Sequence, residues 1–193
     1  MNPKELLNIL SVAERLKCTT RHADTSSGRR ESVAEHSWRL TLMAMLLEDE
    51  FPTLDMNKVI KMCIIHDLGE AFTGDIATFN KTETDTKAED AAYDQWVKTF
   101  PPVQKEQFQE LLGEMGQLES QEAKLYKALD KLEAIIQHNE SDISSWLPLE
   151  YALQLNYGSE EVKFSDYLCQ LKVEIDTWTR QKIQDSKNSG STQ

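Results

Sequence analysis

Residues 63–75 read CIIHDLGEAFTGD, a stretch in which an apolar run leads directly into potential metal ligands. Burying the imidazole of His66 and the carboxylate of Asp67 without partners costs several kcal/mol or forces a pKa shift. A divalent cation offsets that cost, because it binds neutral imidazole and ionised carboxylate together. Glu70 follows within one helical turn, and Asp75 comes after a Thr-Gly break. The stretch predicts a cluster of ionisable groups on one surface; the alternative is a helix C-terminus with a capping histidine and a solvated aspartate.

The size and composition of the chain are those of one globular domain. Its 39% hydrophobic and 28% charged residues are typical of a globular protein. At 193 residues it is long enough to bury a core without disulfides or a structural metal. No apolar run reaches the roughly 20 residues that a membrane span requires, and the charged N-terminus does not resemble a signal peptide. The three cysteines are far apart and show no CxxC spacing, so we expect no disulfides and a cytoplasmic location.

The charge of the chain limits its partners. A formal net charge of −12 argues against a nucleic-acid polymer, because phosphate backbones are held by basic surfaces. It does not argue against a small phosphorylated substrate, since a local metal ion and one or two arginines can dominate the field in a small pocket.

Apolar residues recur at helical spacing along almost the whole chain, which predicts an all-α fold. No alternating strand pattern, internal repeat or Gly-rich phosphate loop is visible. Residues 186–193 contain no apolar side chain, and we expect them to form a disordered tail. The expected helix starts are marked by Asn2-Pro3, by the capping box Ser32–Glu35, by Asp55 and by Ser120.

Residues 18–31 are expected to form a polar loop that differs in charge from the rest of the chain. This loop contains Arg21, His22, Arg29 and Arg30 within a strongly acidic protein. The pattern fits either an ordinary solvated loop or a local site for an anion.

Two further potential metal ligands lie on predicted apolar helix faces. His36 falls on the same helix face as Leu40, and Asp130 directly follows the apolar Leu129. A lone histidine of this kind is more often a hydrogen-bonded core residue, and an aspartate beside Lys131 is by default solvated. Because His36 and the His66-Asp67 pair lie on core-facing surfaces of consecutive helices, however, the set predicts a common metal site.

The order H…HD…D resembles the HD-domain superfamily of metal-dependent phosphohydrolases. Three segments resemble more closely the HD-domain 5′-deoxynucleotidases: EHSWR at 35–39, HDLGEAFTGDI at 66–76 and EAKLYKALDKLEA at 122–134. The resemblance covers roughly residues 5–180. It implies one HD-domain helical bundle over residues 1–185, with a core at about 30–140.

The resemblance also implies roles for individual residues. His36, His66, Asp67 and Asp130 would bind one divalent cation, and the set does not distinguish Mn, Co, Mg, Fe and Zn. Glu70 and Asp75 would be the two catalytic carboxyl groups. The resemblance does not determine which of them acts as general acid and which as general base. Arg21 would grip the substrate phosphate, and Lys131 is a weaker candidate for it whose alternative is a surface ion pair. The substrates would be (deoxy)nucleoside 5′-monophosphates, and the family suggests a homodimer.

The histidines separate this chain from other groups of the superfamily. In bacterial relatives a tryptophan that disfavours ribose follows the phosphate arginine, whereas here the next residue is His22, which leaves the sugar preference open. No histidine lies between Asp67 and Asp130, so a single metal ion is expected, and His138 is expected to be structural. Two alternatives stay open: hydrolysis of another phosphate ester, such as a nucleoside triphosphate or a sugar phosphate, and a metal-stabilised binding or regulatory protein without turnover.

Overall fold

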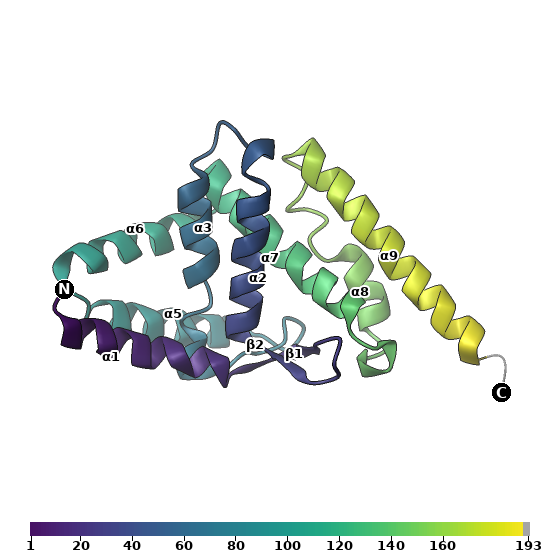
Figure 1. The fold of residues 1–193 in the computed structure, drawn as a ribbon, viewed down its shortest axis with the longest axis horizontal. Helices are drawn as coiled ribbons and strands as arrows, with labels where there is room; N and C mark the ends of the chain where they lie inside the picture. Colours follow the sequence, from purple (N-terminus) through teal and green to yellow (C-terminus); the bar gives the residue numbers. More distant parts are fainter. Residues whose placement is uncertain (191–193) are drawn as a thin grey trace.

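The computed structural model describes residues 1–190, and they form a predominantly helical fold, which confirms the all-α prediction (Figure 1). None of the helices in this part of the chain is long and apolar enough to cross a membrane. In chain order the helices are α1 (Pro3–Ala13), α2 (Val33–Leu46), α3 (Met56–Ile65), α4 (Glu70–Thr73), α5 (Glu83–Val97), α6 (Pro102–Gln117), α7 (Gln121–Glu140), α8 (Glu150–Asn156) and α9 (Asp166–Gly190). Short 3₁₀ turns lie at η1 (Glu14–Lys17), η2 (Glu48–Glu50) and η3 (Ile143–Ser145).

The helix starts that the sequence marks are those of the structure. The side chains of Asn2, Ser32, Asp55 and Ser120 each accept a hydrogen bond from a backbone N–H in the first turn of the following helix. At Ser32 the capping box is complete, because the Glu35 carboxylate also accepts from the Ser32 backbone N–H at 2.9 Å. Each cap satisfies backbone donors that a helix N-terminus otherwise leaves without partners.

Helices α2, α3 and α7 pack against one another and form the centre of the molecule, with α9 along one side (Figure 1). The largest side chains of the core with no exposure include Leu40 on α2, Met62 on α3 and Leu129 on α7. The hydrophobic core also includes Leu168 and Ile175 of α9.

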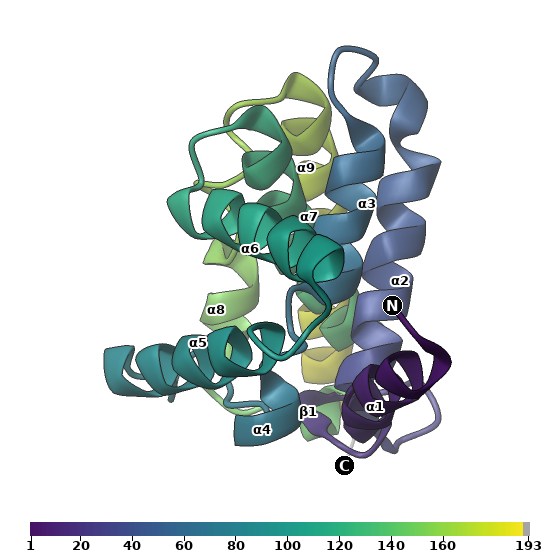
Figure 2. The ribbon, with the colours of Figure 1, turned by 90° about the vertical axis from the view of Figure 1, so that its left-hand side faces the viewer.

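A second apolar cluster forms where α5 ends, and Leu68, Phe108 and Leu112 pack against both this cluster and the main core. Its members are Tyr93, Trp96, Val97 and Phe100. The Tyr93 hydroxyl donates a hydrogen bond of 2.8 Å to the backbone oxygen of Ile65, the last residue of α3. This contact fastens α5 to the point at which the chain leaves α3 for the short helix α4 (Figure 2).

The expected loop at residues 18–31 is instead a β-hairpin, so the prediction of a structureless loop was wrong. Strand β1 (Thr20–Asp24) pairs antiparallel with β2 (Arg30–Ser32), with Thr20 opposite Ser32 and an irregularity in the register. Gly28 takes φ +79° in the connecting turn, a conformation that costs glycine little. The amide of Gln137 on α7 donates a 2.7 Å hydrogen bond to the Asp24 carbonyl, which holds the hairpin against the bundle. A strand of only three to five polar residues lacks the apolar alternation that would reveal it.

Two other differences concern helix ends. Helix α3 ends at Ile65, so a turn separates it from α4 and His66, Asp67 and Glu70 do not share one continuous helix. Helix α9 continues to Gly190, so residues 186–190 of the expected disordered tail are helical, and residues 191–193 lie outside the described residues. The Gln181 amide donates to the Asp185 carboxylate one turn on, a contact that supports this polar helix end.

Replacing Ser32 with alanine removes the hydroxyl of the complete capping box at the start of α2. We expect S32A to lower the free energy of unfolding by about 1 kcal/mol, or about 2–4 °C in Tm for a chain of this size. S32T keeps the hydroxyl and is the matched control in thermal unfolding followed by circular dichroism. Equal Tm values for S32A and the parent protein would show that the cap contributes nothing.

Candidate functional site

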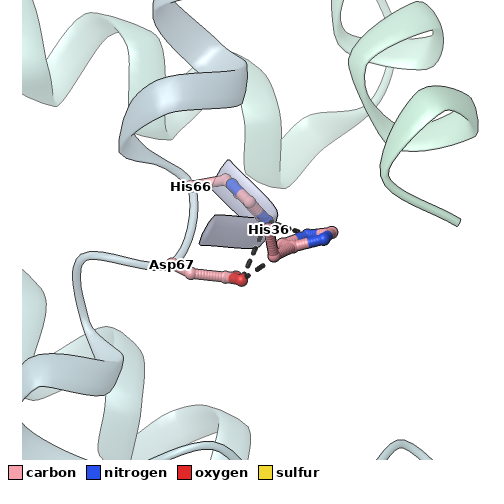
Figure 3. Close-up of side chains that lie close together, drawn as sticks. All are labelled: His36, His66 and Asp67. Carbon is pink, nitrogen blue, oxygen red and sulfur yellow. Dashed lines mark hydrogen bonds and ion pairs between the residues drawn. The ribbon is translucent and has the colours of Figure 1, made fainter. Parts of the chain in front are cut away.

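The four predicted metal ligands come from three elements and meet at one point. His66 and Asp67 lie at the end of α3 and in the turn after it, His36 lies in the first turns of α2, and Asp130 lies in the middle of α7. The Nε2 atoms of the two histidines are 3.3 Å apart, and that of His66 is 2.9 Å from Asp67 Oδ2 (Figure 3). Asp130 Oδ1 completes the group at 3.2 Å from His36 Nε2 and 3.6 Å from His66 Nε2.

The orientation of both imidazole rings suits a cation. His66 Nδ1 donates to the Cys63 carbonyl at 2.9 Å, and His36 Nδ1 donates to the buried carboxylate of Glu133. With Nδ1 engaged as a donor, each neutral ring directs the lone pair of Nε2 into the cluster. Two lone pairs and two carboxylates repel one another unless a positive charge lies between them. The donor set therefore fits a divalent metal ion.

Protons compete for the same nitrogen atoms. Burial lowers the pKa of His66, but the neighbouring Asp67 and Asp130 carboxylates raise it to about 10 in the metal-free protein. The pKa of Asp130, although burial raises it, is held well below its usual range by Lys127 and the two histidines. A cation must displace protons from the imidazoles, so its affinity for this cluster rises with pH.

The two predicted catalytic acids lie beside the cluster. Glu70, at the start of α4, is 4% exposed, and burial together with the charges of Asp67 and Asp75 raises its pKa to about 10. Its Oε2 atom is buried and has no hydrogen-bond partner among the described residues. Burial also raises the pKa of Asp75, while Arg21 and the backbone of His22 counteract this shift. Both acids line the same cavity as Asp67 and Asp130 of the metal cluster.

Arg21, the predicted phosphate ligand, reaches this cavity from strand β1. Its Nη1 lies 3.5 Å from Asp67 Oδ2, and its Nε lies 3.2 Å from Glu31 Oε2. Glu31 is 2% exposed, and burial beside Glu133 raises its pKa to about 7. The hairpin thus gives the guanidinium a fixed place at the edge of the metal cluster.

Lys131 and Lys127 occupy different environments on α7. Lys131 lines the cavity, but its ammonium group pairs with Glu161 and lies 5.1 Å from the centre of the Tyr157 ring. Lys127 Nζ instead lies 2.8 Å from Asp130 Oδ2, the outer oxygen of a cluster carboxylate. Of the two, Lys127 is therefore the nearer cation to the metal cluster, and the sequence analysis did not single it out.

Glu133 and Glu31 are two further residues of the site that sequence reasoning missed. Glu133 is 1% exposed and contacts His36 Nδ1 and, at 2.5 Å, Arg39 Nε. It follows Asp130 by three positions, so its place on the same helix face was available from spacing. The contact with His36, 97 residues away, had no signal in the sequence. Nor did the contact of Glu31 with Arg21, because it depends on the unexpected hairpin.

The cavity has a volume of about 360 Å³, within the range of small-molecule sites. Asp67, Glu70, Asp75 and Asp130 line one part of it, and residues from β1, α7, α8 and the segment before α5 line the rest. A buried metal-ligand cluster, adjoining acids and an arginine in one cavity can bind an anionic ester and move protons next to it.

This fold and site define a metal-dependent hydrolase. Residues 13–172 match the family model of the HD domain. The chain is 33% identical over 150 residues to the 5′-deoxynucleotidase HDDC2 of Mus musculus, covering 76% of this chain and 73% of that protein. It is 32% identical over 139 residues to the Homo sapiens protein of the same name, covering 71% of this chain and 66% of the human protein. The chain belongs to the HD domain family.

A solved structure has the same fold. The crystal structure of a "Predicted metal-dependent phosphohydrolase" from Magnetospirillum magnetotacticum superposes with a TM-score of 0.77 at 24% sequence identity. The match covers 93% of this chain and 95% of that chain. The helical arrangement of this chain is therefore shared with a protein of widely diverged sequence.

Glu70 makes the stability of the metal-free protein depend on pH. Its pKa rises from 4.5 to about 10 on folding, so the stability that it contributes is present below pH 4.5 and is lost as pH rises towards 10. The side chain of E70Q stays neutral at every pH. We therefore expect the free energy of unfolding of E70Q, relative to that of the parent protein, to increase by at least about 1 kcal/mol from pH 5 to pH 8, or about 2–4 °C in Tm.

The measurement is thermal unfolding of metal-stripped protein at both pH values, with E119Q, a change at an exposed glutamate of the α6–α7 connection, as control. A Tm difference between E70Q and the parent that is the same at pH 5 and pH 8 would contradict the raised pKa.

Proposed function

We propose that the protein is a divalent-metal-dependent phosphomonoesterase that hydrolyses (deoxy)nucleoside 5′-monophosphates to nucleoside and phosphate. The observation that carries the proposal is the meeting of His36, His66, Asp67 and Asp130 at one point. Asp67 and Asp130 of this cluster line a cavity together with Glu70 and Arg21. Relatives named 5′-deoxynucleotidases over most of the chain support the choice of substrate.

In this proposal His36, His66, Asp67 and Asp130 hold one cation. Such an ion polarises a phosphoryl oxygen and acidifies water. A single ion follows from the lack of histidines between Asp67 and Asp130 in the sequence. Mn, Co, Mg, Fe and Zn all suit a set of two imidazoles and two carboxylates, so the supply in the cell selects among them.

The remaining residues of the site bind the phosphate and transfer protons. The planar guanidinium of Arg21 suits two phosphate oxygens. Lys127 adds positive charge next to Asp130, and Lys131 contributes to the phosphate only if it leaves Glu161. Glu70 and Asp75 divide two tasks between them, positioning or deprotonating the attacking water and protonating the departing nucleoside oxygen.

Further parts of the proposal concern the protein as a whole. We propose that residues 1–185 act as one HD domain, that the protein is a cytoplasmic homodimer, and that it takes a nucleotide and not a nucleic-acid polymer. Trp178 on α9 is an exposed apolar side chain that a second copy would cover. Light scattering of the purified protein tests the dimer directly.

Phosphate release from metal-stripped protein tests the central proposal. We expect hydrolysis of nucleoside 5′-monophosphates to return when Mn²⁺, Co²⁺ or Mg²⁺ is added back, and H66A and D130A to stay inactive with any of them. E70A should retain the metal in inductively coupled plasma analysis but lose at least about 100-fold in kcat.

Matched ribo- and deoxyribonucleotides measure the sugar preference next to His22. Hydrolysis only of nucleoside triphosphates or sugar phosphates would move the assignment to another ester. No release from any ester, with the fold melting on metal removal, would favour the non-catalytic alternative.

Replacing Arg21 tests its role at the phosphate. We expect R21A to raise KM for nucleotides by about tenfold or more, since a charge-assisted hydrogen bond contributes about 1.5–3 kcal/mol. R30A changes an exposed arginine of the same hairpin that does not line the cavity, so its KM should stay at the parent value. An unchanged KM in R21A would remove Arg21 from phosphate binding.

A further inference from the structure

Gln154, on the cavity side of α8, is a buried amide without a protein partner. The residue is 4% exposed and lines the cavity. Within residues 1–190 its side chain makes no hydrogen bond to another residue, although neighbouring polar groups of the cavity are paired. Neither amide atom is among the fully buried side-chain atoms that lack a partner, so the amide reaches the open space of the cavity. It is therefore available to a ligand that brings both a donor and an acceptor.

Helix α8 is held firmly where it carries Gln154. Glu150, 1% exposed, contacts two histidines of the cavity wall through Oε1: His138 Nε2 at 3.0 Å and His22 Nε2 at 3.5 Å. Its Oε2 accepts from the Leu147 backbone N–H at 2.7 Å. The first turn of α8 is thereby attached to both α7 and the β1 strand, which fixes the orientation of the next turn.

The distance from the metal cluster to this attachment suits a nucleotide. On α7, His138 follows the cluster residue Asp130 by eight positions, or about 12 Å at 1.5 Å per residue. Ala134 lies between them and also lines the cavity. A nucleoside 5′-monophosphate with its phosphate at the cluster would extend along this length of the cavity, with its other end towards α8.

The apolar part of the cavity wall suits a flat, partly apolar group. Phe79, Leu153 and Tyr157 line the same cavity as Gln154. The ring of His22 meets that of Phe79 edge-on with 5.3 Å between centroids, and Tyr157 contacts Thr78 through its hydroxyl at 3.2 Å. Aromatic and apolar surfaces beside one unpaired amide are the usual composition of a site that binds a ring by stacking and one polar edge.

We propose that Gln154 is the polar anchor of a nucleobase subsite, an inference that rests on the proposed nucleotide substrate. A carboxamide presents a donor and an acceptor side by side, and each of the four bases offers an edge with the complementary pair. Rotation of the amide by 180° exchanges its donor and acceptor, so Gln154 accepts all four bases. The subsite recognises the presence of a base and does not select among bases.

The test compares substrates that differ only in the base. For Gln154→Met, which keeps the volume and loses both hydrogen bonds, we measure kcat/KM on four deoxynucleoside 5′-monophosphates and on 2-deoxyribose 5-phosphate. The ratio of nucleotide to base-free substrate should fall about tenfold for all four bases, mainly through KM. Gln107→Met, at an exposed position of α6, should keep the parent ratio. An unchanged ratio in Gln154→Met would overturn the subsite, and a fall for one base alone would overturn its tolerance.

A second measurement separates this inference from the proposed reaction. If the parent protein hydrolyses no nucleotide, the proposed function fails. In that case calorimetry measures whether deoxyadenosine alone binds to the folded parent protein and to the folded variant, and this result tests the subsite independently. About tenfold weaker binding to Gln154→Met supports the subsite. Equal binding to parent and variant, or no binding to either, overturns it.

Discussion

The burial of negative charge around two imidazoles is the constraint on which the rest of the structure depends. Asp67, Asp130 and Glu70 are each strongly shielded from water within one small region. In a medium of low polarity such groups repel one another, so they need cations or protons to remain there. The fold supplies Arg21 and Lys127, and the arrangement of the histidines leaves a place for a divalent ion. Metal binding and the stability of the centre of the fold are therefore linked.

Helix α7 combines the functions of core and site. Its stripe of Leu125, Leu129 and Leu132 is fully buried, while Asp130 and Glu133 on the adjoining face meet the histidine cluster. Because the same rigid helix continues to the attachment point of α8, the metal cluster and the far end of the cavity keep a fixed separation. Rigid elements hold the geometry of a site more precisely than loops do.

Much of this structure could be predicted from the sequence, and the omissions have physical causes. Local signals placed the helix caps at Asn2, Ser32, Asp55 and Ser120, because a cap depends on neighbours within one turn. Periodicity and resemblance brought four ligands to one surface. The β-hairpin could not be predicted from the sequence, because its residues are mostly polar. Its stability comes from tertiary contacts such as that of Gln137 with Asp24. Glu31 was missed for the same reason, since its contact with Arg21 depends on the hairpin. Lys127 differs, because it lies one helical turn before Asp130 and their ion pair was available from spacing.

The hydrogen bond from Tyr93 to the Ile65 carbonyl has a consequence for behaviour on heating. It joins the small apolar cluster of α5 to the end of α3, directly before the turn that carries His66 and Asp67, and Leu68 of that turn packs against the same cluster. A small cluster opens at a lower free energy than the main core. Local opening of the α5 cluster therefore frees the turn that carries two of the four predicted ligands. The geometry of the site thus depends on apolar packing that touches none of the ligand atoms.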